Sequence, residues 1–331
     1  MEKKGTKEQL LMLFENNKGL FLSGEYIAEI LGISRTAVWK SVQTLRNEGY
    51  NISAVRNKGY SLSVESDILS TQGIKKYLKK DWSDMALEVH QSVNSTNTVA
   101  REKAAAGAED GYTVVAGNQT AGRGRMGRSF HSPAKTGIYI SIVLRPERYD
   151  PQQAVKLTTM AAVAVCEAIE SVSGEKAEIK WVNDVFVQEK KVCGILTEAS
   201  FNLEDGMLEY AVLGVGINVF EPEGGFPDEI KNIAGAVFSK SENDAKNRLA
   251  GQFINHFMKY YHNVNGDSDY AEEYRRRSFV IGKNVNVITP KGTREALVLD
   301  VDRECRLLVE YEDGTRESLF SGEISIRLTQ N

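Results

Sequence analysis

Cysteine is scarce in this sequence, and its few positions lie far apart. The three cysteines, Cys166, Cys193 and Cys305, form no CxxC pair, and only four histidines are present. A disulfide framework and a zinc cage of ordinary ligand spacing are therefore excluded, and no metal-ligating residues are predicted. Reduced, buried thiols are typical of the cytoplasm, which is where we expect the protein to be located.

Long apolar runs are also missing. No segment approaches the roughly 20 consecutive apolar residues needed to cross a bilayer, and residues 1–4 (MEKK) do not lead into the apolar core of a signal peptide. We therefore expect no membrane partner. The pattern G-x-x-x-x-G-K-[ST] is absent as well, which argues against a Walker-type ATPase.

The net charge of −4 conceals a basic N-terminal end. Residues 1–62 hold nine Lys or Arg and six Asp or Glu, a net charge of +3, whereas the remaining 32 basic and 39 acidic residues give −7. A small basic end on an acidic body is typical of a nucleic-acid-binding head. With 331 residues, of which 41% are hydrophobic, the chain is long enough for two or three domains.

The first sixty residues have the pattern of a winged helix-turn-helix. Apolar spacing predicts a helix over 6–17, and Ser23 and Ser34 are placed to cap two further helices, the last over 35–48. Two short β-leaning runs within 52–62, joined by Asn-Lys-Gly, predict a hairpin that forms the wing.

A mixed or antiparallel sheet flanked by helices is predicted for the middle of the chain, so the expected fold class is α+β. A long apolar helix is expected over 153–172, and strand-like runs lie at 138–144, 191–200 and 208–220. From Phe279 onward, short strands separated by turns predict a small β-barrel of about 50 residues. The expected domains are 1–64, 65–277 and 278–331, with a polar linker or hinge over 63–70.

The most informative segment is Gly122–Arg128, GRGRMGR, which we call the glycine loop. Glycines let the backbone approach a ligand closely, and arginines donate forked hydrogen bonds to carboxylate and phosphate oxygens. A solvated basic surface loop or an RNA-binding stretch is the alternative. Strand-like runs at 114–116 and 138–144 flank the segment, however, and would hold it at a sheet edge, where ligand sites usually lie.

A second glycine pattern lies on a predicted strand. Gly214, Gly216 and Asn218 alternate along it and therefore share one face of the sheet. Two missing side chains with a polar group beyond them would make room for a ligand. The alternative is a bend at a barrel corner.

The ordered motifs resemble those of the biotin–protein ligases. The glycine loop resembles their Gly-Arg-Gly-Arg-x-Gly-Arg signature, and Ser95-Thr96-Asn97 resembles their Ser-Thr-Asn biotin contact. The run 180–184 (KWVND), followed by 191–195 (KVCGI), resembles their Lys-Trp-Pro-Asn-Asp segment and the strand after it. The resemblance spans nearly the whole chain and fits the bifunctional, repressor-type branch. Val182 stands where that family usually has proline, and we expect this to affect loop stiffness rather than activity.

This resemblance implies a class II synthetase-like central domain and an SH3-like C-terminal barrel. It also implies a two-step reaction: biotin and ATP, with Mg²⁺, give biotinyl-5′-AMP and pyrophosphate, and a lysine of a biotin carboxyl carrier domain then displaces AMP. The adenylate-bound form is expected to dimerise and repress transcription at an operator.

The resemblance also assigns roles to individual residues. Lys191 and Arg125 are the expected catalytic residues, although Lys191 taken alone would pass for an ordinary solvated lysine. The expected biotin-binding residues are Ser95, Thr96, Asn97, Gln119, Arg123, Gly124, Arg125 and Lys191. The expected ATP- and adenylate-binding residues are Arg125, Arg128, Phe130, Lys180, Asn183, Asp184 and Asn218.

The outward face of the helix at 35–48 supplies the expected DNA contacts. Arginine and glutamine can read base edges in the major groove, and lysine can contact phosphate. The expected DNA-binding residues on this helix and on the wing are Ser34, Arg35, Thr36, Lys40, Gln43, Arg56 and Lys58. A winged helix kept for protein contacts is the alternative.

Two other functions remain open at this point. The first is a regulator that senses a small acid without catalysis, which would release no pyrophosphate from ATP. The second is a lipoate–protein ligase, which shares the fold and the adenylate chemistry but is not expected to carry the glycine loop or the winged helix.

Overall fold

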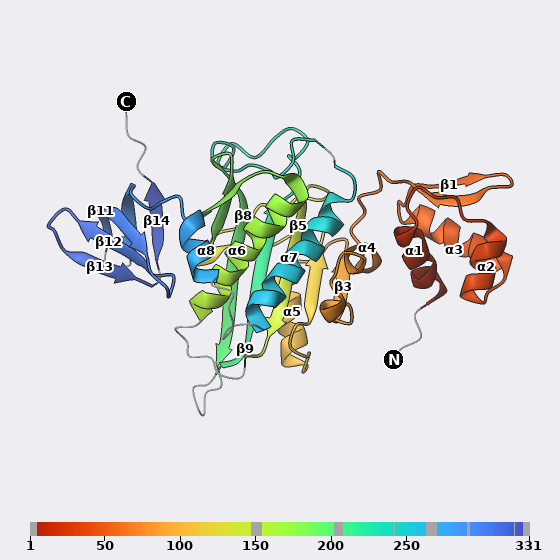
Figure 1. Ribbon diagram of the computed structural model, residues 1–331, viewed down its shortest axis with the longest axis horizontal. Helices are drawn as coiled ribbons and strands as arrows, with labels where there is room; N and C mark the ends of the chain where they lie inside the picture. Colours follow the sequence, from red (N-terminus) through yellow and green to blue (C-terminus); the bar gives the residue numbers. More distant parts are fainter. Residues whose placement is uncertain are drawn as a thin grey trace.

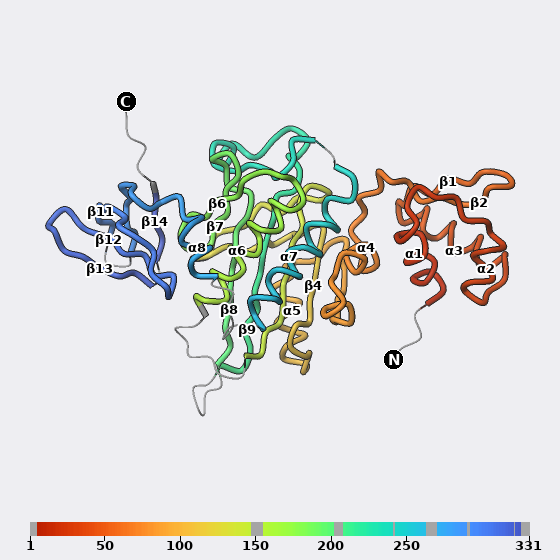
Figure 2. Tube along the Cα trace, in the orientation of Figure 1, coloured from red at the N-terminus to blue at the C-terminus, as the bar shows by residue number. Residues whose placement is uncertain are grey.

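The computed structural model describes residues 5–146, 154–201, 208–240, 242–262, 270–289, 292–320 and 322–326. Three parts follow one another along its longest axis (Figure 1). A small helical head lies at one end, a large sheet with its helices lies in the centre, and a small β-domain lies at the other end (Figures 1 and 2). The predicted order and class of the three parts are confirmed.

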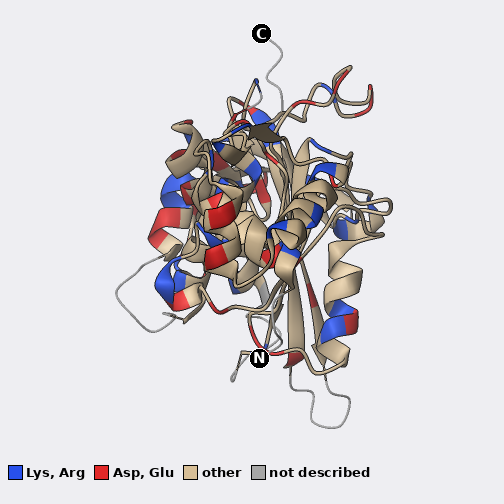
Figure 3. Ribbon diagram, turned by 90° about the vertical axis from the view of Figure 1, so that its right-hand side faces the viewer, with Lys and Arg blue, Asp and Glu red and all other residues tan. Residues whose placement is uncertain are grey.

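The N-terminal head is the predicted winged helix-turn-helix. Its elements are α1 (Thr6–Asn16), α2 (Gly24–Leu31), α3 (Arg35–Asn47), β1 (Ile52–Val55) and β2 (Gly59–Leu62). Ser23 and Ser34 cap α2 and α3, because their hydroxyls accept hydrogen bonds from the amides of Tyr26 at 3.0 Å and Ala37 at 3.2 Å. Lys/Arg and Asp/Glu positions are interspersed over this end of the molecule (Figure 3).

The segment between the head and the sheet makes several hydrogen bonds to the central part. The amide of Ser70 donates to Asn247 Oδ1 at 3.1 Å, and the same side chain donates to the carbonyl of Ile68 at 2.9 Å. The Asp67 carboxylate accepts from the amide of Lys246 at 3.0 Å. The start of one long helix of the central part therefore holds this polar stretch, predicted as a linker or hinge, at several points.

The central sheet is mixed, as predicted. Its order is β3-β4-β5-β9-β8-β7-β6, and among these described strands only β3 and β4 pair in parallel. The strands are β3 (Leu87–His90), β4 (Thr113–Ala116), β5 (Gly137–Leu144), β6 (Ala177–Lys180), β7 (Asp184–Val187), β8 (Lys190–Phe201) and β9 (Leu208–Asn218). The long antiparallel pairs of β9 with β5 and β8 form its centre.

Helices cover both faces of this sheet. The apolar helix α6 (Ala154–Ser173) and α7 (Ala245–His262) pack together on one face, where the main core lies. On the other face, α5 (Thr96–Ala105) packs through Ala100 and Ala104 against Val114, Val143 and Val212. The remaining helical segments are α4 (Thr71–Lys75), η1 (Lys80–Trp82), η2 (Arg125–Gly127) and α8 (Tyr270–Arg277).

The C-terminal domain is a five-stranded antiparallel sheet of order β13-β12-β11-β10-β14. Its strands are β10 (Asn284–Thr289), β11 (Gly292–Val301), β12 (Leu307–Tyr311), β13 (Arg316–Leu319) and β14 (Glu323–Ile326). Its apolar side chains are continuous with the core of the central sheet. Trp181 Nε1 donates to the carbonyl of Cys305 at 2.9 Å, so the turn after β6 is fixed to this domain.

Asp67 in the linker should give the free energy of unfolding a distinct pH dependence. Burial raises its pKa to about 6, and the nearby Lys246 only partly opposes this. A carboxyl group whose pKa is higher in the folded than in the unfolded state favours folding more as the pH falls toward the unfolded value of about 3.9. Between pH 7 and pH 5, wild type should therefore gain about 1 kcal/mol relative to Asp67→Asn.

Urea denaturation of both proteins at the two pH values measures this difference. Parallel pH profiles for wild type and Asp67→Asn would show that Asp67 titrates in the folded protein as it does in the unfolded chain.

Candidate functional site

A cavity of about 140 Å³ opens on the sheet, between the N-terminus of α5, the glycine loop, the β6–β7 turn and β14. All but one of the residues expected to bind biotin or nucleotide line it. They are Ser95, Thr96, Asn97, Gln119, Arg123, Gly124, Arg125, Arg128, Phe130, Lys180, Asn183, Asp184 and Lys191. Segments that are far apart in the sequence thus meet at one place.

Asn218 is the exception. It ends β9, and its side-chain amide donates to the carbonyl of Gly235 at 3.0 Å. It is not among the described residues that line the cavity. Alternation along β9 puts Asn218 on the same face as Gly216. Asn218 lies two residues further along the strand, however, and so falls beyond the cavity.

The glycine loop is a tight turn closed by its own backbone. The amide of Gly124 donates to the carbonyl of Arg128 at 2.7 Å, and the amide of Phe130 donates to the carbonyl of Gly122 at 2.9 Å. A Cβ at Gly122 would lie 2.5 Å from Ser132 Oγ and 2.6 Å from the carbonyl oxygen of Phe130, so a side chain there would force Gly122 and Phe130 apart.

The three arginines of the loop contact three different parts of the protein. Arg123 contacts the carboxylate of Glu198 on β8 at 3.0 Å. Arg125 donates to Asn183 Oδ1 at 2.9 Å and to the carbonyl of Gly322 at 3.0 Å. Arg128 contacts the carboxylate of Glu323 on β14 at 2.7 Å. The C-terminal domain therefore forms part of the cavity wall and holds two of these guanidinium groups.

The glycines of β8 and β9 make room for two side chains of the protein itself. Gly194 and Gly216 are opposite each other in the register, and a Cβ on either would lie within 3 Å of the Phe130 ring. A Cβ on Gly214 would clash with the amide of Asn97 in the same way. The glycines therefore leave the space that the sequence predicts, but Phe130 and Asn97 occupy it.

A chain of hydrogen bonds joins the residues at the α5 end of the cavity. The buried hydroxyl of Ser141 on β5 lies 2.8 Å from Thr96 Oγ1 and 2.6 Å from Asn97 Oδ1. Gln119 Oε1 accepts from the amide of Thr96 at 2.8 Å, and Asn97 Nδ2 donates to Glu198 at 2.7 Å. The side chains expected to contact biotin are thereby held in fixed orientations.

Ser141 and Glu198 belong to this site but were missed from the sequence. A signal for Glu198 existed, because it follows Gly194 and Leu196 at a spacing of two on the strand β8. Ser141 stands alone among apolar residues of β5, which is a sign of a functional hydroxyl. Ser95 was predicted, and as the N-cap of α5 its hydroxyl makes no capping hydrogen bond.

Lys191 faces the cavity because β8 is irregular near its start. The pairing of β7 with β8 shifts register between Cys193 and Lys191, so Lys191 and Gly194 both line the cavity although they are three residues apart. Lys191 Nζ lies 2.7 Å from Asp184 Oδ1. Burial lowers the pKa of Lys180, and Asp184 only partly opposes this. The cavity therefore holds several cations and few carboxylates, which suits an anionic ligand.

A separate groove of about 700 Å³ lies between α3 and the wing. It contains Arg35, Thr36 and Arg56, three of the residues expected to contact DNA. Lys40 and Lys58 are exposed and Gln43 is half-buried, whereas the Ser34 hydroxyl caps α3. Trp39, which is not among the predicted DNA-binding residues, is 53% exposed and also lines the groove. Trp39 follows the buried Val38 on α3, so its side chain lies on the exposed side of this amphipathic helix.

The three parts of the chain each match a known family. Residues 6–61 match an HTH domain, residues 89–218 match the biotin/lipoate A/B protein ligase family, and residues 280–327 match the biotin protein ligase C terminal domain. Among structures, the biotin protein ligase from Aquifex aeolicus in complex with biotin and ATP is 26% identical, with a TM-score of 0.59, covering 73% of this chain and 98% of that chain.

Relatives that match almost the full length are bifunctional. The bifunctional ligase/repressor BirA of Bacillus subtilis is 37% identical over 97% of this chain and 98% of its own length. That of Escherichia coli is 29% identical over 96% of each. The chain therefore belongs to the family of bifunctional biotin–protein ligases and repressors, as its sequence motifs predict.

Proposed function

We propose that the protein joins biotin to a lysine of a carrier protein through biotinyl-5′-AMP and represses transcription in response to biotin. The observation that carries the proposal is the convergence of Arg123, Arg125, Lys180 and Lys191 on one cavity beside the N-terminus of α5. Biotin and ATP are the substrates that this family requires. The relatives do not favour the sensor or lipoate alternatives.

The reaction needs an anion to attack an anion. An oxygen of the biotin carboxylate attacks the α-phosphorus of ATP, a P–O bond breaks, and pyrophosphate leaves. The carrier lysine amine then attacks the acyl carbon, loses a proton, and AMP leaves. No side chain of the enzyme forms a covalent bond, so catalysis consists of positioning, charge compensation and exclusion of water.

The loop arginines and Lys191 would compensate the charge. Arg125 and Lys191 would contact the reacting carboxylate and α-phosphate, and Arg123 would clamp biotin. These groups contact Asn183, Asp184 and Glu198. A bound adenylate would replace those partners, so binding exchanges one set of charge-assisted hydrogen bonds for another.

The other residues would set orientation. Ser95, Thr96, Asn97, Gln119 and Gly124 would hold the rings and carboxylate end of biotin. The groups that would hold the nucleotide are Arg128, Phe130, Lys180, Asn183, Asp184 and, after some movement, Asn218. Phe130 would cover the adenine from its place over Gly194 and Gly216.

Mg²⁺ would enter with the nucleotide. Within the described residues no group of three His, Cys, Asp or Glu could hold a metal ion. Asp184 and Asn183 fit the common case in which one or two oxygen ligands and the substrate phosphates share the ion. Bound there, Mg²⁺ would offset phosphate charge.

The head would bind operator DNA through Arg35, Thr36, Lys40 and Gln43 of α3, with Ser34 at its start and Arg56 and Lys58 on the wing. One head offers few base contacts, so useful affinity would need a homodimer on two half-sites. The adenylate-bound form would be that dimer. The acceptor would be a biotin carboxyl carrier domain in the cytoplasm, and none of the described helices is both long and apolar enough to span a membrane.

Replacing Lys191 should slow the ligation reaction. Wild type incubated with biotin, Mg-ATP and a carrier domain should add the mass of one biotinyl group to the carrier and release pyrophosphate. Lys191→Met should lower kcat/KM by roughly 10²-fold, because removing one group that stabilises transition-state charge typically costs this much. The matched control is Lys190→Met, since Lys190 donates outside the cavity to the carbonyl of Asn232. Equal rates for the two variants would remove Lys191 from the catalytic role.

A methyl group at Gly216 should impair use of ATP. The added Cβ would lie 2.7 Å from the Phe130 ring, so Gly216→Ala should displace the ring and raise KM for ATP by about tenfold. Phe130→Ala should also raise KM for ATP, and adding Gly216→Ala to it should raise KM little further, because both changes act through the same ring. Initial rates at varied ATP test both, and an unaltered KM in Gly216→Ala would contradict a nucleotide site there.

Operator binding should depend on the adenylate. Footprinting on the operator should show protection at least tenfold tighter with biotin and ATP than without them, because the ligand would favour the dimer. Equal protection in both conditions would mean that ligation and DNA binding are uncoupled.

A further inference from the structure

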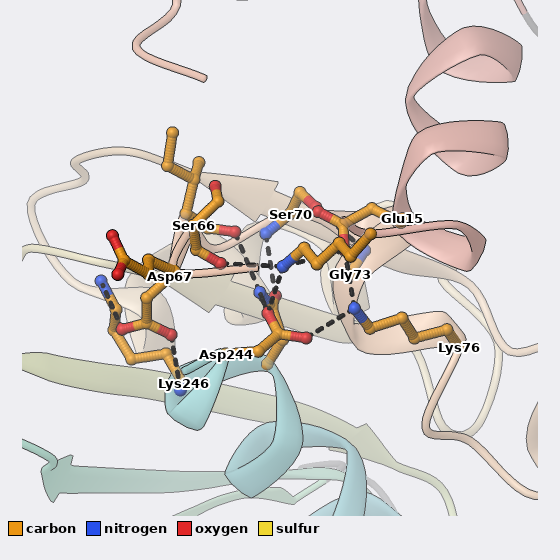
Figure 4. A network of polar contacts seen from close by, with 12 residues as sticks. Glu15, Ser66, Asp67, Ser70, Gly73, Lys76, Asp244 and Lys246 are labelled. Carbon is orange, nitrogen blue, oxygen red and sulfur yellow. Dashed lines mark hydrogen bonds and ion pairs between the residues drawn. The ribbon is translucent and has the colours of Figure 1, made fainter. Parts of the chain in front are cut away.

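Four charged side chains form a closed ring where the head meets the ligase part (Figure 4). Glu15 on α1 and Lys18 just after it belong to the head, whereas Lys76 follows α4 and Asp244 precedes α7. Lys18 lies 3.2 Å from Glu15 and 2.9 Å from Asp244. Lys76 lies 2.7 Å from Glu15 and 2.5 Å from Asp244. Each ammonium therefore bridges the two carboxylates.

The ring is buried. The side chains of Glu15 and Asp244 are 1% and 6% exposed, and those of Lys18 and Lys76 are 10% and 13% exposed. The intact ring is neutral, with two ammonium groups and two carboxylates. Removing one of these four side chains would leave an uncompensated buried charge, which destabilises the folded protein. Any tilt of the head away from the ligase part would separate these pairs.

The ring is also tied to the linker. Lys18 Nζ donates to the carbonyl of Ser66 at 2.8 Å, and the Tyr77 hydroxyl donates to Asp244 Oδ2 at 2.6 Å. Asn247 Nδ2 contacts both Asp244 and the linker carbonyl of Ile68. The hydrogen bonds to Asp244 lower its pKa even though burial alone would raise it, so the carboxylate is charged at neutral pH.

We propose that Asp244 and its ring are positioning residues that fix the orientation of the DNA-binding head on the ligase part. The inference rests on the proposed repressor function, because a dimer reads two half-sites only when its recognition helices are held at one separation. A head joined by a flexible linker alone would accept many separations. The ring therefore sets the half-site spacing that the dimer accepts.

Head motion tests the inference without DNA. Nuclear relaxation of backbone amides should give the head of wild type the same rotational correlation time as the ligase part. In Asp244→Asn, the correlation time of the head should fall by about twofold or more, since the head would move independently. The matched control is Asp228→Asn, which removes an exposed carboxylate paired with Lys231 at 2.8 Å.

Operators with altered spacing test the consequence. With biotin and ATP present, inserting two base pairs between the half-sites should weaken wild-type binding by at least tenfold. Asp244→Asn should bind the native operator about tenfold more weakly than wild type and lose less than threefold on insertion. Ligation of a carrier domain should stay within twofold of wild type, because no ring member lines the cavity.

A second variant covers the case in which Asp244→Asn does not fold. Lys18→Gln removes one cation from the head side and should have the same two effects. If the folded variants keep the wild-type correlation time and spacing dependence, the inference is wrong. If wild type itself does not bind the operator, the proposed repressor function fails, while the relaxation result still decides whether the ring fixes the head.

Discussion

Charge compensation between guanidinium groups and oxygen atoms is the interaction on which this structure depends. The glycine loop brings three arginines to one place, and each has an acceptor from a different element: Glu198 of β8, Asn183 of the β6–β7 turn and Glu323 of β14. A cationic loop without such acceptors would repel itself and stay open. These acceptors hold the three guanidinium groups in place, and they are groups that an anionic ligand can replace.

The sequence predicted the elements with strong local signals. Serine caps marked α2 and α3, glycine and arginine marked the loop, and alternation marked the long strands. The expected ligand-binding residues form one cavity, with Asn218 as the exception. Local patterns suffice for these features because capping, turn geometry and strand alternation act over a few residues.

What could not be predicted depends on contacts between distant segments. Ser141 and Glu198 carry only weak strand signals and Glu323 carries none, and the roles of all three come from the pairing of β5, β8 and β14 with other parts of the fold. The irregular pairing that turns Lys191 toward the cavity was equally hidden, because the alternation rule assumes a regular strand. The polar composition of residues 63–70 predicted a linker or hinge but did not reveal its partners Lys246 and Asn247.

The two terminal domains are attached to the centre by different kinds of surface. The C-terminal strands share one continuous apolar core with the central sheet, whereas the head has its own separate core and meets the centre through charged and polar groups. Loss of the head would therefore leave a polar, hydrated surface on the central part. Loss of the C-terminal strands would instead expose apolar side chains, which favour aggregation. A shorter ligase that lacks the head would therefore stay folded and soluble, whereas one that lacks the C-terminal domain would not.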